Sequence, residues 1–278
     1  MQTPSLASLA QNLRAGSVGI LGVPFDANSS FRRGAAAGPT SLRQALHSSS
    51  ANLCAENGLD LASEASWVDL GDLELAHAEE ALAAIETGAA KVLATDARLI
   101  SLGGDHSIAY PLLRAHAQLY PKLNLLQIDA HPDLYEELDG NRFSHACPFA
   151  RILEEGLVQR LVQVGIRTMN PHQQKQAERF GVEVIDMRSW RPDIQLHFDG
   201  PVYLSVDLDA LDPAFAPGVS HHEPGGLSTR DLLGIVQGFE GKLVGADIVE
   251  LNPERDWMGM TAMAAAKILK EVLARLLQ

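Results

Sequence analysis

LNLLQIDAHPD, residues 123–133, is an apolar run that ends in a group of acidic and imidazole side chains. A short run of large aliphatic residues is typical of a buried β-strand. At its end, Asp129, His131 and Asp133 occupy every second position, and in an extended segment such side chains point to the same face. The stretch therefore predicts a buried strand that brings three potential metal ligands to one place.

Six other segments repeat this short apolar pattern, and longer helical patterns separate them. The other expected strands are VGILGVPFD (18–26), RLISLGGDH (98–106), RLVQVGIRT (160–168), VEVIDMR (182–188), VYLSVDLD (202–209) and VGADIVEL (244–251). The expected helices cover residues 41–49, 78–95, 107–120, 148–156, 171–181, 228–240 and 260–278. This alternation predicts a mostly parallel sheet of about eight strands with helices on both faces. No repeat or linker interrupts it, so we expect one domain over residues 1–278.

Composition and charge restrict the possible partners. Hydrophobic residues make up 46% of the chain, enough for a sizeable core, and the net charge of -13 repels nucleic acid and favours a small cationic substrate. The sequence shows neither an apolar membrane span nor a secretory signal at its start. Its two cysteines, Cys54 and Cys147, are too few for a disulfide framework. We therefore expect a cytoplasmic protein with no membrane or nucleic-acid partner.

Two further polar clusters stand where expected strands end. GGDHS (103–107) turns from a strand into a helix at Asp105 and His106, and SVDLDALDP (205–213) carries Asp207 and Asp209 on one face of a strand. In a parallel sheet, ligand sites lie beyond the carboxyl ends of the strands, so we expect the clusters to converge. Together they offer four carboxylates and two imidazoles as metal ligands: His106, Asp129, His131, Asp133, Asp207 and Asp209.

The charge of this ligand set requires compensation. Crowded carboxylates raise one another's pKa unless positive charge lies among them, and two divalent cations balance the four negative charges. Because the set is rich in oxygen and contains no thiolate, it favours a hard ion such as Mn²⁺ over Zn²⁺. Ni²⁺ and Co²⁺ accept the same ligands. The expected cofactor is two Mn²⁺ per subunit.

LGGDHS (102–107), DAHPDLY (129–135) and SVDLDALDPAFAPG (205–218) resemble the three signature blocks of the ureohydrolase family, which includes arginases and agmatinases. The similarity runs from about residue 22 to residue 256 and is greatest for plant-type arginases and bacterial agmatinases. It implies a three-layer α/β/α fold, a binuclear manganese site and homotrimers or homohexamers. It also implies that one metal is bound by His106 and Asp133, the other by His131 and Asp209, and that two residues bridge the pair, Asp129 and Asp207.

The resemblance further implies roles for His145 and Glu250. His145, in NRFSHACPF (141–149), matches the family's loop histidine, which shuttles protons. Glu250, in DIVELNP (247–253), matches the carboxylate that binds the guanidinium, and a glutamate at the end of an apolar strand is otherwise costly to bury. In the expected mechanism Glu250 aims the guanidinium carbon at an activated water. Asp133 passes a proton to the leaving nitrogen, and His145 protonates the departing amine.

Substrate choice depends on loops, where the residues favour agmatine without excluding arginine. Tyr135 stands where animal and bacillary arginases have Asn, and agmatinases and plant-type arginases share this Tyr. GIRTMNP (165–171) resembles agmatinases and places Asn170 near the substrate. His221, in VSHHEPGGLS (219–228), replaces the Thr of most of the family, although plant-type arginases share a related run. No basic residue is an obvious carboxylate anchor, since Arg151 and Arg167 are only near in sequence. We expect agmatine to be converted to putrescine, with arginine to ornithine as the alternative and guanidinobutyrate and free guanidine also open.

Two hypotheses come from other functional classes. The same fold hosts zinc deacetylases, which act on an amide with one metal ion. A catalytically silent oligomer that kept the scaffold is the other. The complete set of six ligands argues against both.

Overall fold

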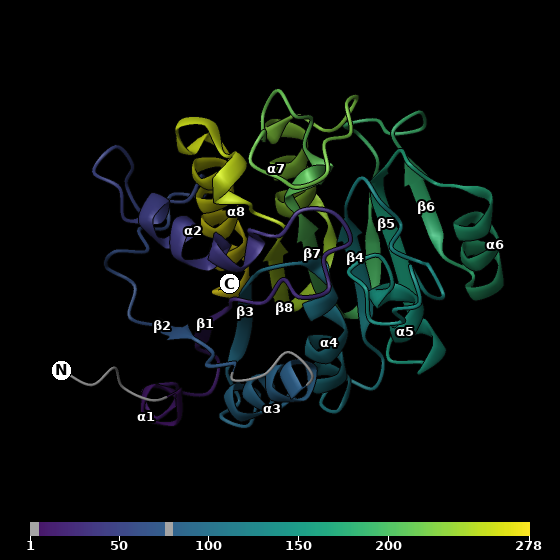
Figure 1. Cartoon of the computed structure of the whole chain (residues 1–278). Helices are drawn as coiled ribbons and strands as arrows, with labels where there is room; N and C mark the ends of the chain where they lie inside the picture. The colour runs from purple at the N-terminus through teal and green to yellow at the C-terminus, as the bar shows by residue number, and fades with distance from the viewer. Residues whose placement is uncertain (1–5, 76–79) are drawn as a thin grey trace.

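A computed structural model describes residues 6–75 and 80–278, whose strands form one parallel sheet (Figure 1). The strands are β1 (Val18–Val23), β2 (Trp67–Asp72), β3 (Arg98–Gly103), β4 (Asn124–Ile128), β5 (Arg160–Ile166), β6 (Glu183–Asp186), β7 (His197–Asp207) and β8 (Glu240–Val249). All neighbouring strands pair in parallel. The expected parallel sheet of about eight strands is confirmed.

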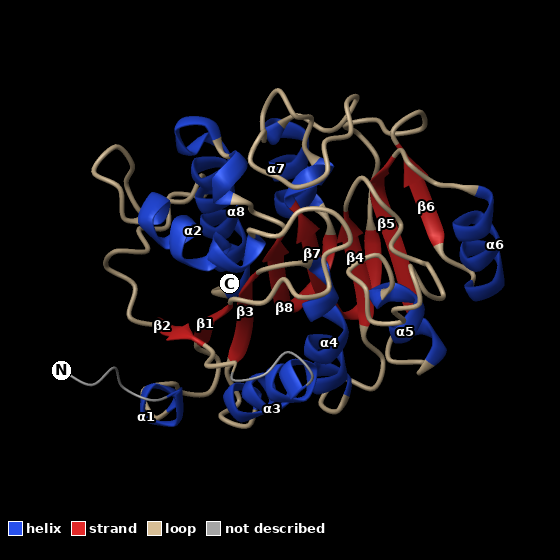
Figure 2. Ribbon diagram, in the orientation of Figure 1, coloured by secondary structure: helices blue, strands red, loops and turns tan. Residues whose placement is uncertain are grey.

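Helices cover both faces of the sheet (Figure 2). They are α1 (Leu6–Ala10), α2 (Gly38–Leu46), α3 (Ala81–Leu93), α4 (Ala109–Ala117), α5 (Pro148–Glu154), α6 (Pro171–Phe180), α7 (Thr229–Gly238) and α8 (Met260–Leu276). One apolar core lies between the sheet and α2, α7 and α8, and a second lies under α3, α4 and α5. Successive strand residues such as Leu125 and Leu126 enter opposite cores, as the pleat requires. The three-layer α/β/α fold is confirmed.

The strand order determines where a site can form. The order is β2-β1-β3-β8-β7-β4-β5-β6, so β3 and β4 follow each other in the chain but are separated in the sheet by β8 and β7. A parallel sheet opens a crevice beyond its carboxyl ends where the direction of winding reverses. These four central strands are the ones that lead into the candidate site residues.

Apart from Asp207, the last residue of β7, the residues that carry the chemistry lie just after the strands. β4 ends at Ile128, and Asp133 has a φ of 49°, in the left-handed region. Asp207 ends β7, while Asp209 belongs to a short 3-10 turn over Leu208–Ala210. The expectation that strand alternation aligns these side chains is therefore wrong. Tight turns beyond the strands bring them together.

Two elements were not expected from the sequence, β2 and α1. β2 is an edge strand with polar, partly exposed residues, and its Asp69 and Asp72 pair with Arg43 of α2. It therefore lacks the apolar run that marks the central strands. Residues 78–79 of the expected helix 78–95 lie outside the described residues. Within the described part of the chain, no helix combines the length and apolar character needed to cross a membrane.

Candidate metal centre

Four neighbouring strands lead into the candidate site residues, which lie at the carboxyl edge of the sheet. His106 follows β3, Asp129 follows β4, Asp207 ends β7 and Glu250 follows β8. The six expected metal ligands come together there, and five are buried: His106, Asp129, Asp133, Asp207 and Asp209. The sixth, His131, is partly exposed, with 27% of its side chain accessible. It therefore forms part of the wall that faces solvent.

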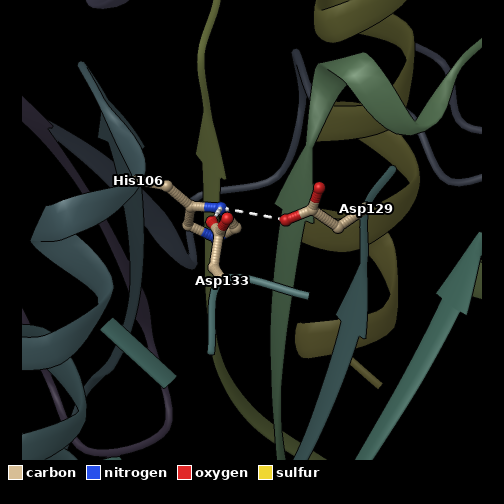
Figure 3. A group of neighbouring side chains, drawn as sticks. All are labelled: His106, Asp129 and Asp133. Carbon is tan, nitrogen blue, oxygen red and sulfur yellow. Dashed lines mark ion pairs between the residues drawn. The ribbon is translucent and has the colours of Figure 1, made fainter. Parts of the chain in front are cut away.

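His106 faces three carboxylates through a single nitrogen atom, and Figure 3 shows two of them, those of Asp129 and Asp133. Its Nδ1 lies 3.1 Å from Asp129 Oδ2 and 3.2 Å from the Oδ2 atoms of Asp133 and Asp207. None of these approaches has the geometry of a hydrogen bond, and the buried Nδ1 has no other partner. A nitrogen lone pair among three carboxylate oxygens needs a cation between them. The residues present therefore fit a metal ion.

A second group of ligands surrounds His131. Its Nδ1 lies 3.0 Å from Asp209 Oδ2 and 3.7 Å from Asp129 Oδ1. The ligand atoms of Asp129, His131 and Asp209 are close enough to hold one metal, as are those of His106, Asp129 and Asp133. Asp129 belongs to both groups. The geometry thus offers two adjacent metal positions with a shared carboxylate.

The pKa values of these groups reflect how closely charge is packed. Burial lowers the pKa of His131, but the carboxylates of Asp209 and Asp129 outweigh it and raise the pKa to about 12. The pKa of His106 is likewise raised, since three carboxylates outweigh its burial. Burial and neighbouring negative charge raise the pKa of Asp133 to about 6 and that of Asp207 well above its ordinary value. Without metal, these side chains thus hold protons on their ligand atoms. Bound metal ions would displace those protons.

This competition predicts that metal binding releases protons. At pH 7 we expect Mn²⁺ binding to displace at least about two protons per subunit, one from each histidine, and we expect affinity for Mn²⁺ to increase as pH rises. Calorimetric titration in two buffers of different ionisation enthalpy measures the released protons directly. Equal apparent enthalpies in the two buffers would contradict the assignment of His106 and His131 as ligands.

A buried hydrogen-bonded chain orients His106 from behind. Ser205 Oγ lies 2.8 Å from His106 Nε2 and donates to Asp247 Oδ1 at 2.7 Å, while the hydroxyl of Tyr203 donates to Asp247 Oδ2 at 2.9 Å. Because the serine hydroxyl donates to Asp247, it accepts from the Nε2–H of His106. This arrangement leaves the Nδ1 lone pair directed at the carboxylates. Asp247 thus lies behind the ligand and holds both hydroxyls of the chain.

The turn after β3 is fixed by close packing and by a buried carboxylate. A Cβ on Gly104 would lie 1.8 Å from the carbonyl oxygen of Phe25, so only glycine fits at this position. Asp105 accepts hydrogen bonds from the backbone of Ser107 and Asn28 and from the hydroxyl of Ser29. Asp105 thereby ties the loop after β1 to the turn that carries His106.

His145 and Glu250 form a buried pair beside the metal ligands. His145 Nδ1 lies 2.8 Å from Glu250 Oε1, and its Nε2 lies 2.8 Å from the hydroxyl of Ser30. Glu250 also accepts from the backbone N–H of His106 at 2.9 Å. Burial lowers the pKa of His145, but the charge of Glu250 outweighs it and raises the pKa to about 9. His145 is therefore protonated at neutral pH and available as a proton donor.

A cavity of about 280 Å³ opens above this centre. Its lining includes His131, Asp133, Tyr135, His145, Asp207, Asp209, His221 and Glu250. Asn170, an expected substrate contact, is not on this wall. Its side-chain oxygen accepts from the N–H of Gln173 and caps α6, and its Nδ2 donates to the hydroxyl of Tyr135 at 2.5 Å. Asn170 therefore holds Tyr135, which does line the cavity, in place.

The two arginines considered as carboxylate anchors are also absent from the cavity wall. Arg151 pairs with Glu154 and donates to the backbone carbonyl of Glu136. Arg167 donates to backbone carbonyls, including those of Asp209 and Glu223. Both guanidiniums are therefore occupied in holding loops.

Sequence reasoning missed three polar residues that support the site: Ser30, Gln127 and Ser205. Gln127 donates to Asp129 Oδ2 at 2.7 Å and Ser205 contacts His106. A signal for these two was available, because each precedes a ligand by two positions in an otherwise apolar strand. Ser30 lies in a loop far along the chain from His145, and nothing in its local sequence indicates that contact.

Similarity to known proteins agrees with this geometry. Residues 16–274 match the family model described as "Arginase family". The chain is 43% identical over 277 residues to the mitochondrial arginase 1 of Arabidopsis thaliana, covering 94% of this chain and 81% of that protein. It is 37% identical over 269 residues to the agmatinase of Serratia proteamaculans (strain 568), covering 91% and 85%. The solved arginase from Medicago truncatula superposes with a TM-score of 0.90 at 39% identity, covering 98% of this chain and 91% of that one.

Proposed function

The chain belongs to the arginase family of guanidino C–N hydrolases, and from this premise we propose that it hydrolyses L-arginine to urea and L-ornithine. One observation carries the proposal: two adjacent metal positions sharing Asp129 lie beside the buried pair of His145 and Glu250. The metal positions give a site for an activated water. Glu250 gives a negative group for a guanidinium, and His145 gives a proton donor for the leaving amine.

Arginine replaces agmatine as the favoured substrate. The sequence favoured agmatine because of Tyr135, the GIRT turn and the absence of an obvious carboxylate anchor. The similarity to a plant arginase, at 43% identity, is greater than that to a bacterial agmatinase, at 37%. Because Tyr135 and the run around His221 were features shared with plant-type arginases, they do not oppose arginine.

We propose that the two metals are Mn²⁺, one held by His106 and Asp133 and the other by His131 and Asp209. Asp129 lies in both groups, and Asp207 approaches His106 from β7, so both are proposed to bridge. The oxygen-rich donor set supports a hard ion. When bound, the two cations supply an activated water for attack on the guanidinium carbon.

The protein's own residues then position the substrate and move its protons. Glu250, 3% exposed, forms a charge-assisted pair with the guanidinium, and this pair replaces its contact with His145 Nδ1. Asp133 lies on the same cavity wall and carries a proton to the leaving nitrogen. His145, held at Nε2 by Ser30, protonates the departing amine.

A panel of guanidino substrates tests this function. Purified full-length protein is loaded with Mn²⁺, and urea release is measured with L-arginine, agmatine, guanidinobutyrate and free guanidine. We expect the highest kcat/KM for L-arginine and no urea after chelation of metal, because the activated water requires it. A higher kcat/KM for agmatine would contradict the choice of substrate. Absence of urea from all four would contradict the function.

We also propose that the protein is a cytoplasmic homotrimer or homohexamer. Its resemblance to ureohydrolases supports the assembly, and its free cysteines, Cys54 and Cys147, suit a reducing compartment. Light scattering coupled to size-exclusion chromatography measures the assembly, and a monomeric mass would contradict it.

A further inference from the structure

A row of buried polar side chains crosses the sheet beside the metal ligands. Each member stands in a different strand, and all are 0% exposed: Ser101, Asp247, Ser205, Gln127 and Gln163. Backbone register places each beside the next, from β3 through β8, β7 and β4 to β5. The residues before and after each member belong to the apolar core under α2, α7 and α8. The row therefore faces the opposite layer, where α3, α4 and α5 lie.

The part of the row in β7 and β8 reaches His106. The hydroxyl of Ser205 lies between Asp247 Oδ1, at 2.7 Å, and His106 Nε2, at 2.8 Å. Both oxygens of Asp247 accept a hydroxyl, the second from Tyr203, as an ionised carboxylate does. In the part of the chain that the structure describes, Asp247 forms no ion pair within 4.0 Å. A buried carboxylate without a cationic partner is costly, and a cation bound at His106 Nδ1 compensates it through the serine and the imidazole.

The part of the row in β4 and β5 supports Asp129 and the turn that follows it. Gln127 Nε2 donates to Asp129 Oδ2 at 2.7 Å and to the carbonyl of His131 at 3.0 Å. Gln163 Nε2 donates to Gln127 Oε1 at 2.6 Å and to the carbonyl of Pro132 at 2.7 Å. Because Gln163 donates to the oxygen of Gln127, the amide of Gln127 presents its nitrogen, and not its oxygen, to Asp129.

We propose that this row sets the affinities of the two metal positions separately. Asp247 and Ser205 are positioning residues for the position that contains His106, because within the described residues their side chains bond only to His106, Tyr203 and each other. Gln127 acts on Asp129, which both positions share, so it sets both affinities together. The proposal rests on the proposed function, because it concerns the binuclear centre that this function requires.

The charge of Asp247 selects the form of His106 that binds a cation. Because the carboxylate only accepts, the hydroxyl of Ser205 donates to it, the serine oxygen accepts from Nε2–H, and Nδ1 keeps its lone pair. In Asp247→Asn the amide nitrogen is able to donate to Ser205, and the serine hydroxyl then donates to Nε2. The proton of the neutral imidazole moves to Nδ1, where it blocks metal binding.

Calorimetric titration of the full-length apoprotein with Mn²⁺, in the absence of substrate, tests the proposal. We expect Asp247→Asn and Ser205→Ala each to weaken one of the two positions about 10–100-fold and to leave the other unchanged. Gln127→Met keeps the length of the side chain but removes the donor to Asp129, so it should weaken both positions. A loss confined to one position in Gln127→Met would overturn the role assigned to Gln127.

Electron paramagnetic resonance gives a second readout that is independent of turnover. Two adjacent Mn²⁺ ions couple magnetically, whereas a single bound ion gives the hyperfine lines of isolated Mn²⁺. At a Mn²⁺ concentration that just fills both positions of the wild type, Asp247→Asn should give the spectrum of isolated Mn²⁺.

Ser101→Ala is the matched control. Ser101 is as buried as Ser205 and lies beside Asp247 in the neighbouring strand, but its hydroxyl has no hydrogen-bond partner among the described residues. Its two Mn²⁺ affinities should therefore equal those of the wild type. Ser205→Thr restores the hydroxyl that Ser205→Ala removes and should recover the lost affinity. Circular dichroism verifies that each variant is folded.

The outcomes separate the two proposals. If the wild type shows no coupled pair of Mn²⁺ ions, the binuclear centre and the proposed function fail, whatever the variants do. If the wild type binds a coupled pair but Asp247→Asn and Ser205→Ala keep both affinities, as Ser101→Ala does, the role of the row is overturned and the function stands. Equal weakening of both positions in these two variants would likewise overturn separate control.

Discussion

Asp209→Ala is expected to reduce urea release at least about a thousandfold and to remove one of the two metal ions. Asp209 Oδ2 lies 3.0 Å from His131 Nδ1, and together with Asp129 they form one of the two metal positions. Loss of a residue that hydrogen-bonds to a metal ligand lowers metal affinity or activity about 10–100-fold. Loss of the ligand itself has a larger effect. Plasma emission analysis of the purified protein should give close to one metal per subunit instead of two.

Two other variants show whether this loss is specific. His145→Ala should slow turnover but keep both metals, because His145 contacts Glu250 and Ser30 rather than the ligand cluster. Asp199→Ala removes an aspartate from the exposed start of β7, where 98% of its side chain is accessible, and should change neither metal content nor activity. If His145→Ala loses as much metal as Asp209→Ala, the separation of the two roles is wrong.

Glu250→Gln is expected to lower kcat/KM for L-arginine about a hundredfold to a thousandfold, about 3–4 kcal/mol, while both metals remain bound. The substitution keeps the size of the side chain but removes the negative charge that a guanidinium requires. Removing one partner of a buried charge pair has a large effect, since the other charge is left uncompensated.

The same variant should also change the pH dependence of turnover. Burial lowers the pKa of His145 and Glu250 raises it, with a net value of about 9. Without that carboxylate the pKa of His145 falls, so the protonated form is lost at lower pH. The alkaline limb of the kcat/KM profile, which reports the substrate-free enzyme, should therefore move to lower pH. Glu240→Gln, at the exposed start of β8, is the control. An alkaline limb that does not move in Glu250→Gln would contradict the role of His145 as proton donor.

The sequence predicted the sheet and the convergence of the six candidate ligands because both depend on local patterns. Runs such as LNLLQID combine apolar burial with a polar end, and parallel sheets place such ends at one edge. The ligands converge because the strand ends lie at one edge. Strand alternation, the reason expected from the sequence, does not bring them together. Asp133 reaches the centre through a left-handed backbone position and Asp209 through a 3-10 turn, and strand periodicity reveals neither.

Contacts between distant parts of the chain were what sequence could not supply. Ser101, Gln163 and Asp247 are separated by long stretches of chain, and only the strand order and register place them in one buried row. Asn170 has a structural role that sequence reasoning did not assign to it. Its position in the GIRTMNP segment suggested a substrate contact, but an asparagine immediately before Pro171 is also a strong helix cap, and the cap is what forms.

The position of β8 has a consequence for how the chain folds. β8 comes last in the sequence but lies between β3 and β7, joining the β1–β3 half of the sheet to the β4–β7 half. While the chain is being synthesised, each half has strands to pair with, but a gap separates His106 from the other five ligands until residues 240–249 insert. His106 on one half and the aspartates on the other thus meet only after nearly the whole polypeptide has emerged. We therefore expect the metal position that includes His106 to form only once the sheet is complete.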